Sequence, residues 1–521
     1  MAANSVSRRD FLAQAALATA ALGLPHPANA AEESKHSGRP NILVIMSDEH
    51  NASVMGCAGN PIIHTPSLDG LARDGVVFDA CYCASPLCVP SRLSFTTGKY
   101  ASRVGAWNND CELPAPDYPS LPAALNAAGY ESFLCGKMHY AADRRYGFRE
   151  IGGNMNRSTK TGRGTRRDAD DLAPTPGISE RFEQFHTNDT SNGMDHDLAV
   201  TRGVQEFLKG RKQEDAPFFL LAGYITPHFP LIVPQKYWEE YKGKVPMPVI
   251  PEGYLDKLPR NYKHLRVGFN MEDVPEDVVR RGRELYYGLV QWTDERVGEV
   301  LRALETAGLA ENTVVIYTAD HGENMGEHGL WWKNCVYDTA ARVPLIMRWP
   351  GRWPGRQHRT EACSLLDVVR TIADIGHARM PKDCNGDSML GWLDHPDTKW
   401  KDLAASEYYA HNIASGYAMV RMGQYKYVYH TPANAGHPAE RELYDLKADP
   451  GELNNLAALP EQAERVASMH AAMVREIGEN PDETELRCRR TTMTEDAPAE
   501  KGMGKKKGKG NRVTTEATEG H

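Results

Sequence analysis

The chain has 521 residues, of which 41% are hydrophobic and 25% charged, and its formal net charge at pH 7 is −9. This composition is typical of a globular protein, and the length leaves room for more than one domain. The negative net charge excludes a general attraction to nucleic acid or to an anionic membrane surface, so we expect no nucleic-acid partner. Ten cysteines occur without a repeated CxxC spacing, which excludes a zinc-finger type of site.

The first thirty residues have the features of an export signal. Arg8 and Arg9 form a twin-arginine pattern, and an apolar run and an A-x-A cleavage site ending at Ala30 follow it. The apolar run is shorter than the roughly 20 residues that a membrane span requires. We therefore expect residues 1–30 to be a twin-arginine signal of a bacterial protein that is periplasmic or extracellular, without stable membrane insertion.

Apolar runs and amphipathic stretches alternate along residues 38–395. The sequence predicts buried strands at 41–46, 76–78, 130–135, 218–225, 313–318 and 342–347, and helices at 65–72, 121–128, 278–307 and 364–375. Strands that alternate with helices predict an α/β fold, with a large, mostly parallel central sheet between two layers of helices. We assign this region to one catalytic domain.

The pattern changes after residue 395. Short strands within 417–446 and a helix at 460–477 indicate a smaller C-terminal subdomain built on an antiparallel sheet, which we assign to 396–483. Residues 484–521 are charged and then rich in Gly and Lys, and we expect them to be a disordered tail. Within the catalytic domain, residues 152–195 show little periodicity and are predicted to be a long polar loop.

Five segments of the chain supply polar side chains, most of them directly after a predicted strand. These side chains are Asp48 and Glu49, Cys88 and Arg92, Lys137 and His139, His228, and Asp320, His321 and Lys333. The carboxyl ends of neighbouring parallel strands meet at one edge of a sheet, where α/β proteins bind their ligands. Any one of these residues alone would more often be structural, but together they predict a single site.

Three of these residues have side chains that suit a metal ion. Asp48 and Asp320 offer carboxylate oxygens, and His321 offers an imidazole nitrogen. An oxygen-rich set of ligands favours Ca²⁺ or Mg²⁺ over zinc. A bound divalent cation would polarise an anionic ester and lower the pKa of a coordinated hydroxyl.

The remaining polar residues suit the hydrolysis of an anionic ester. Arg92, Lys137 and Lys333 would offset the negative charge of the nucleophile and of the substrate. His228 or His139 would protonate the leaving oxygen, because the pKa of an imidazole lies near neutral pH.

A more specific pattern occurs at 83–99, which reads C-A-S-P-L-C-V-P-S-R-L-S-F-T-T-G-K. Cys88, Pro90 and Arg92 followed by Thr97-Gly98 resemble the signature of type I sulfatases, within the alkaline phosphatase superfamily, and the resemblance extends over about 41–455. In that family a formylglycine-generating enzyme converts the cysteine to formylglycine. One hydroxyl of the formylglycine hydrate attacks sulfur and releases the alcohol, and collapse of the other hydroxyl back to the aldehyde then expels sulfate.

The resemblance implies a role for each residue of the predicted site. Cys88 matches the formylglycine, which is also a metal ligand, and Arg92 matches the residue that supports the hydrate. Asp48, Glu49, Asp320 and His321 match the other metal ligands, although many members have Asp in place of Glu49 and Asn in place of His321. Substrate-binding and acid–base roles match Lys137, His139, His228 and Lys333. The resemblance implies Ca²⁺ as the metal, with Mg²⁺ as the alternative.

The sequence also bears on the substrate. Residues 82–88, 102–106 and 136–139 resemble choline-sulfatases in particular. A quaternary ammonium group requires an aromatic cage, whereas the loop at 152–195 is rich in arginine and poor in aromatic residues, which suits an anionic sugar. We therefore expect a sulfated carbohydrate as substrate. The alternatives are choline sulfate, a phosphonate or phosphate monoester, and binding of sulfated sugar without catalysis.

Overall fold

The computed structural model describes residues 39–157, 166–174 and 176–493. The predicted export signal at 1–30 lies outside the described residues. The chain divides after Arg39, and the elements described below all belong to the compact unit that begins at Pro40. Within the described ranges, none of the helices is long and apolar enough to cross a membrane.

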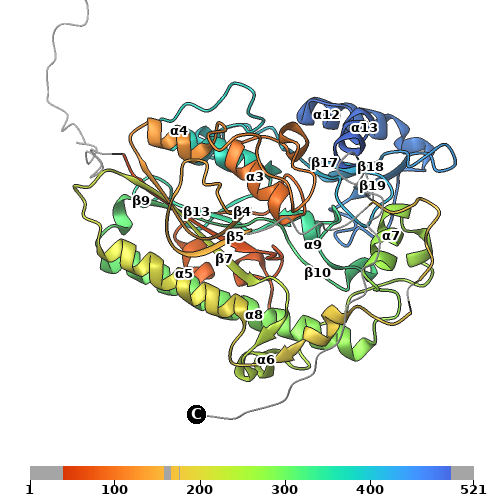
Figure 1. Cartoon of the computed structure of the whole chain (residues 1–521), viewed down its shortest axis with the longest axis horizontal. Coiled ribbons are helices and arrows are strands. Elements are labelled where there is room, and N and C mark those ends of the chain that lie inside the picture. Colours follow the sequence, from red (N-terminus) through yellow and green to blue (C-terminus); the bar gives the residue numbers. More distant parts are fainter. Residues whose placement is uncertain (1–38, 158–165, 175, 494–521) are drawn as a thin grey trace, which may run out of the picture. The chain divides into compact units, whose positions relative to one another are not determined.

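Eight strands form the central sheet (Figure 1). From edge to edge they are β14 (Gln357–Arg359), β2 (Val76–Phe78), β13 (Leu345–Arg348), β9 (Thr313–Ala319), β1 (Asn41–Asp48), β7 (Phe218–Pro227), β4 (Glu131–Ala141) and β5 (Arg149–Arg157). Strand β13 runs antiparallel to both of its neighbours, and the other neighbouring pairs are parallel. The predicted large, mostly parallel sheet is confirmed.

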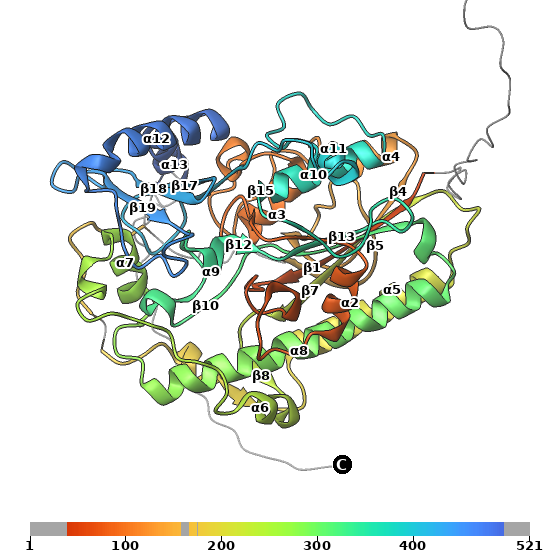
Figure 2. The ribbon, with the colours of Figure 1, turned by 180° about the vertical axis from the view of Figure 1, so that it is seen from behind.

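Helices cover both faces of this sheet (Figures 1 and 2). One face carries α2 (Pro66–Arg73), α5 (Asn192–Lys209) and the 31-residue α8 (Glu276–Thr306); the other carries α3 (Cys88–Thr97), α4 (Leu121–Ala127) and α10 (Leu365–Ile375). Strand β1 is buried at all eight positions, as expected for a continuous apolar run at the centre of a parallel sheet.

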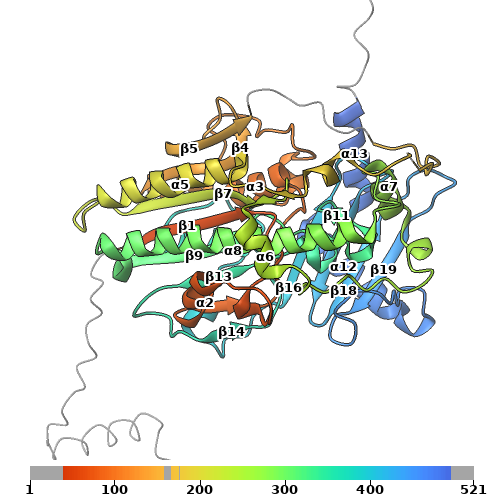
Figure 3. The same ribbon diagram turned by 90° about the horizontal axis from the view of Figure 1, so that it is seen from below.

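A second, antiparallel sheet follows in the C-terminal part of the chain (Figure 3). Its strands are β16 (Leu403–Tyr408), β17 (Tyr417–Met422), β18 (Tyr425–His430) and β19 (Glu440–Asp445), and α12 (Ala463–Ile477) packs on them. The smaller antiparallel subdomain is therefore confirmed. Shorter helices elsewhere are α6 (Gln235–Tyr241), α7 (Arg260–Gly268), α9 (Asp338–Ala341) and α11 (Leu390–Asp394).

The strand predicted at 342–347 is instead two strands in two sheets. Pro344 separates β12 (Arg342–Val343) from β13, because proline has no N–H to donate to a strand ladder. Strand β12 pairs with β3 (Cys81–Tyr82), which also pairs with β15 (Cys363–Ser364). This small sheet lies beside β16 of the C-terminal sheet.

The prediction of one long loop at 152–195 is wrong at both ends. Strand β5 runs to Arg157 and pairs with β4 only, and an edge strand of this kind lacks the continuous apolar pattern of a central one. At the other end α5 begins at Asn192, where the Ser191 hydroxyl caps it by accepting from the Met194 N–H. Gly203 weakens the helical pattern in the sequence of α5. The structure explains this glycine, because a Cβ there would lie 2.8 Å from Cys135 Sγ.

The predicted disorder at 484–521 is wrong for its first ten residues. Helix α13 covers Pro481–Met493, and Cys488 on it is fully buried. Its charges are neutralised by neighbours, because Glu485 pairs with Arg166 at 2.9 Å and with Arg489 at 2.7 Å. Residues 494–521 lie outside the described part of the chain.

Candidate active site

The ends of three central strands bring the first polar groups together. Strand β1 ends at Asp48, which is in register with Pro227 at the end of β7, and Ser47 is in register with Ala319 at the end of β9. His228 and Asp320 are the next residues along their chains. The structure thus places Asp48, His228 and Asp320 at the same edge of the sheet.

Helix α3 presents Cys88 and Arg92 to this edge. Cys88 is the first residue of the helix and Arg92 lies one turn further on, so the two side chains share a face. Pro90 is tolerated in the first turn, where a missing N–H removes no helical hydrogen bond. The N-terminus of a helix carries partial positive charge, which favours an anionic group at position 88.

Strand β4 continues past the sheet edge and carries Lys137 and His139 into the site. Gly136 has φ 99°, and a Cβ there would lie 2.2 Å from the carbonyl oxygen of Gly223. A Cβ on Gly223 would in turn lie 2.1 Å from the Lys137 carbonyl oxygen. Both glycines are therefore needed for the close approach of β4 and β7 that sets the position of Lys137.

Arg92 connects three of the segments that form the site. Its Nε lies 2.8 Å from Asp320 Oδ2 and its Nη2 lies 2.8 Å from Asp48 Oδ2. Its Nη1 donates to the Lys137 carbonyl oxygen at 2.7 Å. Lys137 Nζ lies 2.5 Å from the same Asp48 oxygen. The Oδ2 atom of Asp48 thus faces two cations, which leaves its Oδ1 atom directed to the rest of the site.

Four side chains direct potential metal ligands at one another. The ligand atoms of Asp48, Cys88, Asp320 and His321 all lie within 4.8 Å of one another, and all four residues are buried. His321 Nε2 lies 3.8 Å from Asp48 Oδ1, 3.7 Å from Asp320 Oδ1 and 3.3 Å from Cys88 Sγ. The donor set fits a divalent cation, because two carboxylates and an imidazole converge where water is excluded.

Lys333 and His228 lie on the more open side of this cluster. Their Nζ and Nε2 atoms are 2.8 Å apart, and Lys333 Nζ lies 3.4 Å from Cys88 Sγ. Glu49 faces both, with Oε1 3.2 Å from Lys333 Nζ and Oε2 3.3 Å from His228 Nε2. The side chains of His228 and Lys333 are 20% and 11% exposed, whereas Glu49 is fully buried. Substrate would therefore enter beside His228 and Lys333.

The electrostatics of the site favour negative charge at position 88. Burial and the Asp48 carboxylate oppose ionisation of the Cys88 thiol, yet Lys333, Lys137 and His321 hold its pKa well below the ordinary value. His139 also bonds to Cys88, and burial lowers the pKa of this imidazole. The groups around Cys88 Sγ are thus the donors that an oxyanion at this position requires.

Glu323 also belongs to the cluster, although the sequence did not single it out. Burial and the neighbouring Glu49 carboxylate raise its pKa well above the ordinary value. Its Oε1 accepts from the Trp332 N–H at 2.7 Å, next to Lys333, and Trp332 has the left-handed φ of 66°. The sequence feature that could have identified Glu323 as a site residue is its position three residues after Asp320.

Two arginines of 152–195, the segment whose arginines suit an anionic sugar, are held by acidic side chains. Arg166 is held by Glu485 on α13, and Arg167 pairs with Asp171 at 2.9 Å. Arg163 lies outside the described residues, and the side chain of Arg157 is not described.

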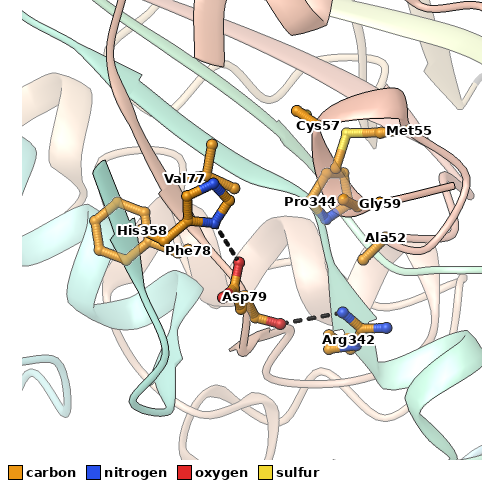
Figure 4. Close-up of a pocket in the computed structure, with 11 residues that line it drawn as sticks. Ala52, Met55, Cys57, Gly59, Val77, Phe78, Asp79, Arg342, Pro344 and His358 are labelled. Atoms are coloured by element: carbon orange, nitrogen blue, oxygen red, sulfur yellow. Dashed lines mark hydrogen bonds and ion pairs between the residues drawn. The ribbon is translucent and has the colours of Figure 1, made fainter. Parts of the chain in front are cut away.

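A cavity of about 330 Å³ lies elsewhere, beside β2 and the segment that follows β1 (Figure 4). His358 Nδ1 lies 3.0 Å from Asp79 Oδ1, and Arg342 Nη1 donates to the Asp79 carbonyl oxygen at 3.1 Å. Cys57, another lining residue, has its pKa raised to about 12 by burial. None of the predicted site residues lines this cavity.

Known solved structures share the fold. A protein solved in complex with its substrate D-glucosamine-2-N,6-O-disulfate aligns with a TM-score of 0.67 and 22% identity over 86% of this chain and 100% of that one. The phosphonate monoester hydrolase of Agrobacterium radiobacter aligns with a TM-score of 0.68 and 22% identity over 84% and 95% of the two chains.

Curated relatives are similar over most of their length. A choline-sulfatase of Rhizobium meliloti is 31% identical over 457 residues, which covers 81% of this chain and 83% of the relative. An ulvan-active sulfatase of Formosa agariphila is 26% identical over 473 residues, with 88% and 84% covered.

Two family models match the chain. The C-terminal model of N-sulphoglucosamine sulphohydrolase matches residues 326–479, and the sulfatase model matches residues 40–378. The chain therefore belongs to the sulfatase family, whose members generally use formylglycine and a metal ion.

Proposed function

We propose that this sulfuric ester hydrolase removes sulfate from a sulfated carbohydrate, with formylglycine at position 88 in place of Cys88. The observation that carries the proposal is the position of Cys88 in the buried cluster with Asp48, Asp320 and His321. Formylglycine would supply a hydrate whose second hydroxyl lets sulfate be expelled. The formylglycine-generating enzyme would be the partner that makes it.

We propose that Asp48, Asp320 and His321 hold the metal ion together with the group at position 88. Carboxylate oxygens favour Ca²⁺, with Mg²⁺ as the alternative. The bound ion would draw negative charge from a sulfate oxygen and from the nucleophile. Glu49 remains a weaker candidate ligand, because its two oxygens face Lys333 and His228.

The cations of the site would bind and orient the sulfate group. Lys333 lies within 3.4 Å of Cys88 Sγ and can offset the charge of a sulfate that approaches the same atom. Lys137 and Arg92 hold Asp48 in place, and Arg92 also holds Asp320. These two residues would act on the substrate mainly through the carboxylates that they fix.

An imidazole would supply the proton to the leaving oxygen. His228 Nδ1 bonds the Phe229 carbonyl oxygen, which directs Nε2 toward Lys333 and the cluster. His228 lies on the open side, where the leaving alcohol would depart, and it is our first candidate for the acid. His139 contacts Cys88 and is suited to exchange a proton with the group at position 88.

The names of relatives support a carbohydrate substrate. An N-acetylglucosamine-6-O-sulfatase of Bacteroides thetaiotaomicron is 25% identical over 517 residues, and the ulvan-active sulfatase is also named for a glycan. The choline-sulfatase and the phosphonate monoester hydrolase support choline sulfate and phosphonate monoesters as the second candidates.

Turnover of matched aryl esters tests this proposal. Protein produced with a formylglycine-generating enzyme should hydrolyse 4-nitrophenyl sulfate and sulfated sugars faster than a 4-nitrophenyl phosphonate. Faster turnover of the phosphonate would replace sulfatase by phosphonate hydrolase as the function. Binding of sulfated sugars without turnover would reduce the protein to a sugar-binding role.

We also propose the predicted domain organisation and export. Residues 38–395 would form the catalytic domain and 396–483 the C-terminal subdomain, which the start of the antiparallel sheet at Leu403 supports. The twin-arginine pattern supports export of the folded, already modified enzyme to the periplasm or beyond. Loss of export on replacing Arg8 and Arg9 with lysine is the expected result, measured by cell fractionation.

A further inference from the structure

Three aromatic rings surround the guanidinium group of Arg181. Its Cζ lies 4.8 Å from the ring centroid of Trp332, 5.0 Å from that of Phe229 and 5.3 Å from that of Phe269. The rings of Phe229 and Phe269 stand edge-on to Trp332, at 69° and 60°. This arrangement is an aromatic cage, the kind of site that binds cations. We call these three rings the Arg181 cage.

The Arg181 cage borders the open side of the active site. Phe229 follows His228 in the chain, and the ring centroids of these two residues are 5.9 Å apart. Trp332, another ring of the cage, directly precedes Lys333 of the site in the chain. His228 lies on the open side of the site, and the Phe229 ring therefore connects the Arg181 guanidinium to that side.

Local structure fixes Arg181 in this position. It lies on a short 3₁₀ helix, Glu180–Gln184, where the Ser179 hydroxyl accepts from the Arg181 N–H at 3.3 Å. The Ser179 N–H donates to the Asn270 carbonyl oxygen at 3.2 Å, next to Phe269 of the cage. Phe182 is buried and packs 5.4 Å from Trp332. The backbone at Arg181 is thus held by hydrogen bonds and by the packing of the neighbouring Phe182.

An occupied cage has two consequences for a substrate. A quaternary ammonium group cannot enter it, because the rings already bind a cation of the same charge. A guanidinium group that packs against rings keeps its planar fork of N–H donors, and this fork recognises carboxylates and sulfates.

We propose that Arg181 is a specificity-determining residue that binds a second anionic group of the substrate and excludes quaternary ammonium esters. The second group is a carboxylate or another sulfate, on the sugar whose sulfate is cleaved. This inference rests on the proposed function, because it concerns the same site. It explains how a chain similar to a choline-sulfatase can act on a polyanionic carbohydrate.

The test compares substrates that differ by one charge. The enzyme is assayed on a monosulfated neutral disaccharide, on the same disaccharide carrying a uronic carboxylate, on a disulfated form and on choline sulfate. For either doubly anionic sugar, Arg181→Met should lower kcat/KM by about tenfold, and for the neutral disaccharide by no more than about twofold. The sugar that loses more identifies carboxylate or sulfate as the bound group. Choline sulfate should become a better substrate of Arg181→Met.

Arg211 offers a matched control. Its Cζ lies 5.4–5.8 Å from the rings of Phe133, Phe207 and Phe218, near the end of β4 opposite to the active site. Arg211→Met removes the same kind of stacking and should lower stability without changing the ratio between the sugars. Arg181→Lys keeps the charge without the planar N–H fork, and its ratio should fall between those of the wild type and Arg181→Met.

The possible results separate the two proposals. If no sulfate ester is hydrolysed by the wild type, the proposed function itself is wrong. If sulfate esters are hydrolysed but the wild type does not prefer the doubly anionic sugars over the neutral one, the inference about Arg181 is wrong. The wild-type comparison needs no variant, so an absent preference overturns the inference even if Arg181→Met does not fold. The inference is also wrong if Arg181→Met leaves unchanged the ratio of kcat/KM between the doubly anionic sugars and the neutral one.

Discussion

Arg92 is the residue on which the geometry of the site depends. It is fully buried with Asp48 and Asp320, and each ion pair has a distance of 2.8 Å. Removing charges from water is costly, so a buried pair of this kind adds little net stability. Its contribution is positional, because it fixes the orientation of two carboxylates that come from different strands.

The first prediction concerns the nucleophile. Cys88→Ala should abolish turnover of aryl sulfate, because no other group in the cluster can become formylglycine. Its far-UV circular dichroism and melting temperature should stay close to those of the wild type. Cys57→Ala is the control, since that thiol has its pKa raised to about 12 by burial and lies outside the site. Turnover of aryl sulfate by Cys88→Ala at the wild-type rate would refute the assignment of position 88 as the nucleophile.

The second prediction concerns the metal. Asp320→Asn should lower the bound Ca²⁺, measured by elemental analysis after dialysis, because a neutral amide replaces one of two carboxylates. Asp374→Asn, which alters a carboxylate on α10 that pairs with Arg370, should keep the metal content of the wild type. Equal metal in the two variants would remove Asp320 from the ligand set.

At the scale of elements, the central strands were predictable and the sheet edge was not. Strands β1, β7 and β9 are apolar on both faces, so their sequences form continuous apolar runs. Strand β5 and helix α5 are interrupted by polar residues and by glycines that closely packed neighbours require, such as Gly153 beside Val200 and Gly203 beside Cys135. The sequence patterns of β5 and α5 depend on residues that are close in space but distant in the chain. Hydrophobic periodicity within a short window does not detect such neighbours.

The same distinction applies to the site. Groups that directly follow a strand, such as Asp48 and Asp320, could be predicted to converge because sheet topology aligns strand ends. Glu323 and Arg181 are defined by what they contact. The rings around Arg181 come from segments up to 151 residues away in sequence, at Phe229, Phe269 and Trp332, and only the folded chain brings them together.

The third prediction concerns the turn between β10 (Asn324–Met325) and β11 (Trp331–Trp332). His328 in this turn is stacked on Tyr337, with ring centroids 3.6 Å apart, and bonds the Tyr254 hydroxyl at 2.5 Å. Burial is the main cause that lowers the pKa of His328 to about 4. The negative charges of Glu327 and Glu442 act against this shift, and the positive charge of Lys426 acts in the same direction as burial. The folded protein therefore resists a proton that the unfolded chain accepts.

The stability of the protein should consequently fall as the pH falls from about 6.5 to about 4, by up to about 3 kcal/mol from this residue. In urea titrations at several pH values, His328→Asn should show a smaller loss over this range, and asparagine tolerates the φ of 56° found here. If the variant and the wild type lose stability in parallel, His328 is not the source.

At the scale of the whole described unit, buried charges join the C-terminal sheet to the catalytic part. Lys426 on β18 is fully buried, 2.5 Å from Asp338 and 2.7 Å from Glu452. It also donates to the Val336 carbonyl oxygen at 3.0 Å, three residues after Lys333 of the site. The C-terminal sheet therefore supports the segment that carries Lys333.

The fourth prediction follows from this contact. Lys426→Met should lower the free energy of unfolding by about 3–5 kcal/mol, because it leaves the buried Glu452 carboxylate without its cation. Asp338 keeps its ion pair with Arg342. Denaturant unfolding measures the change, with Lys382→Met, an exposed lysine, as the control. A loss below about 1 kcal/mol would mean that water or another cation compensates the carboxylates.

The most direct test of the nucleophile is the mass of the peptide that contains residue 88, measured in active enzyme. We predict formylglycine at this position, with activity proportional to the modified fraction when the supply of the formylglycine-generating enzyme is varied. Fully active protein that retains an unmodified cysteine at position 88 would contradict this prediction.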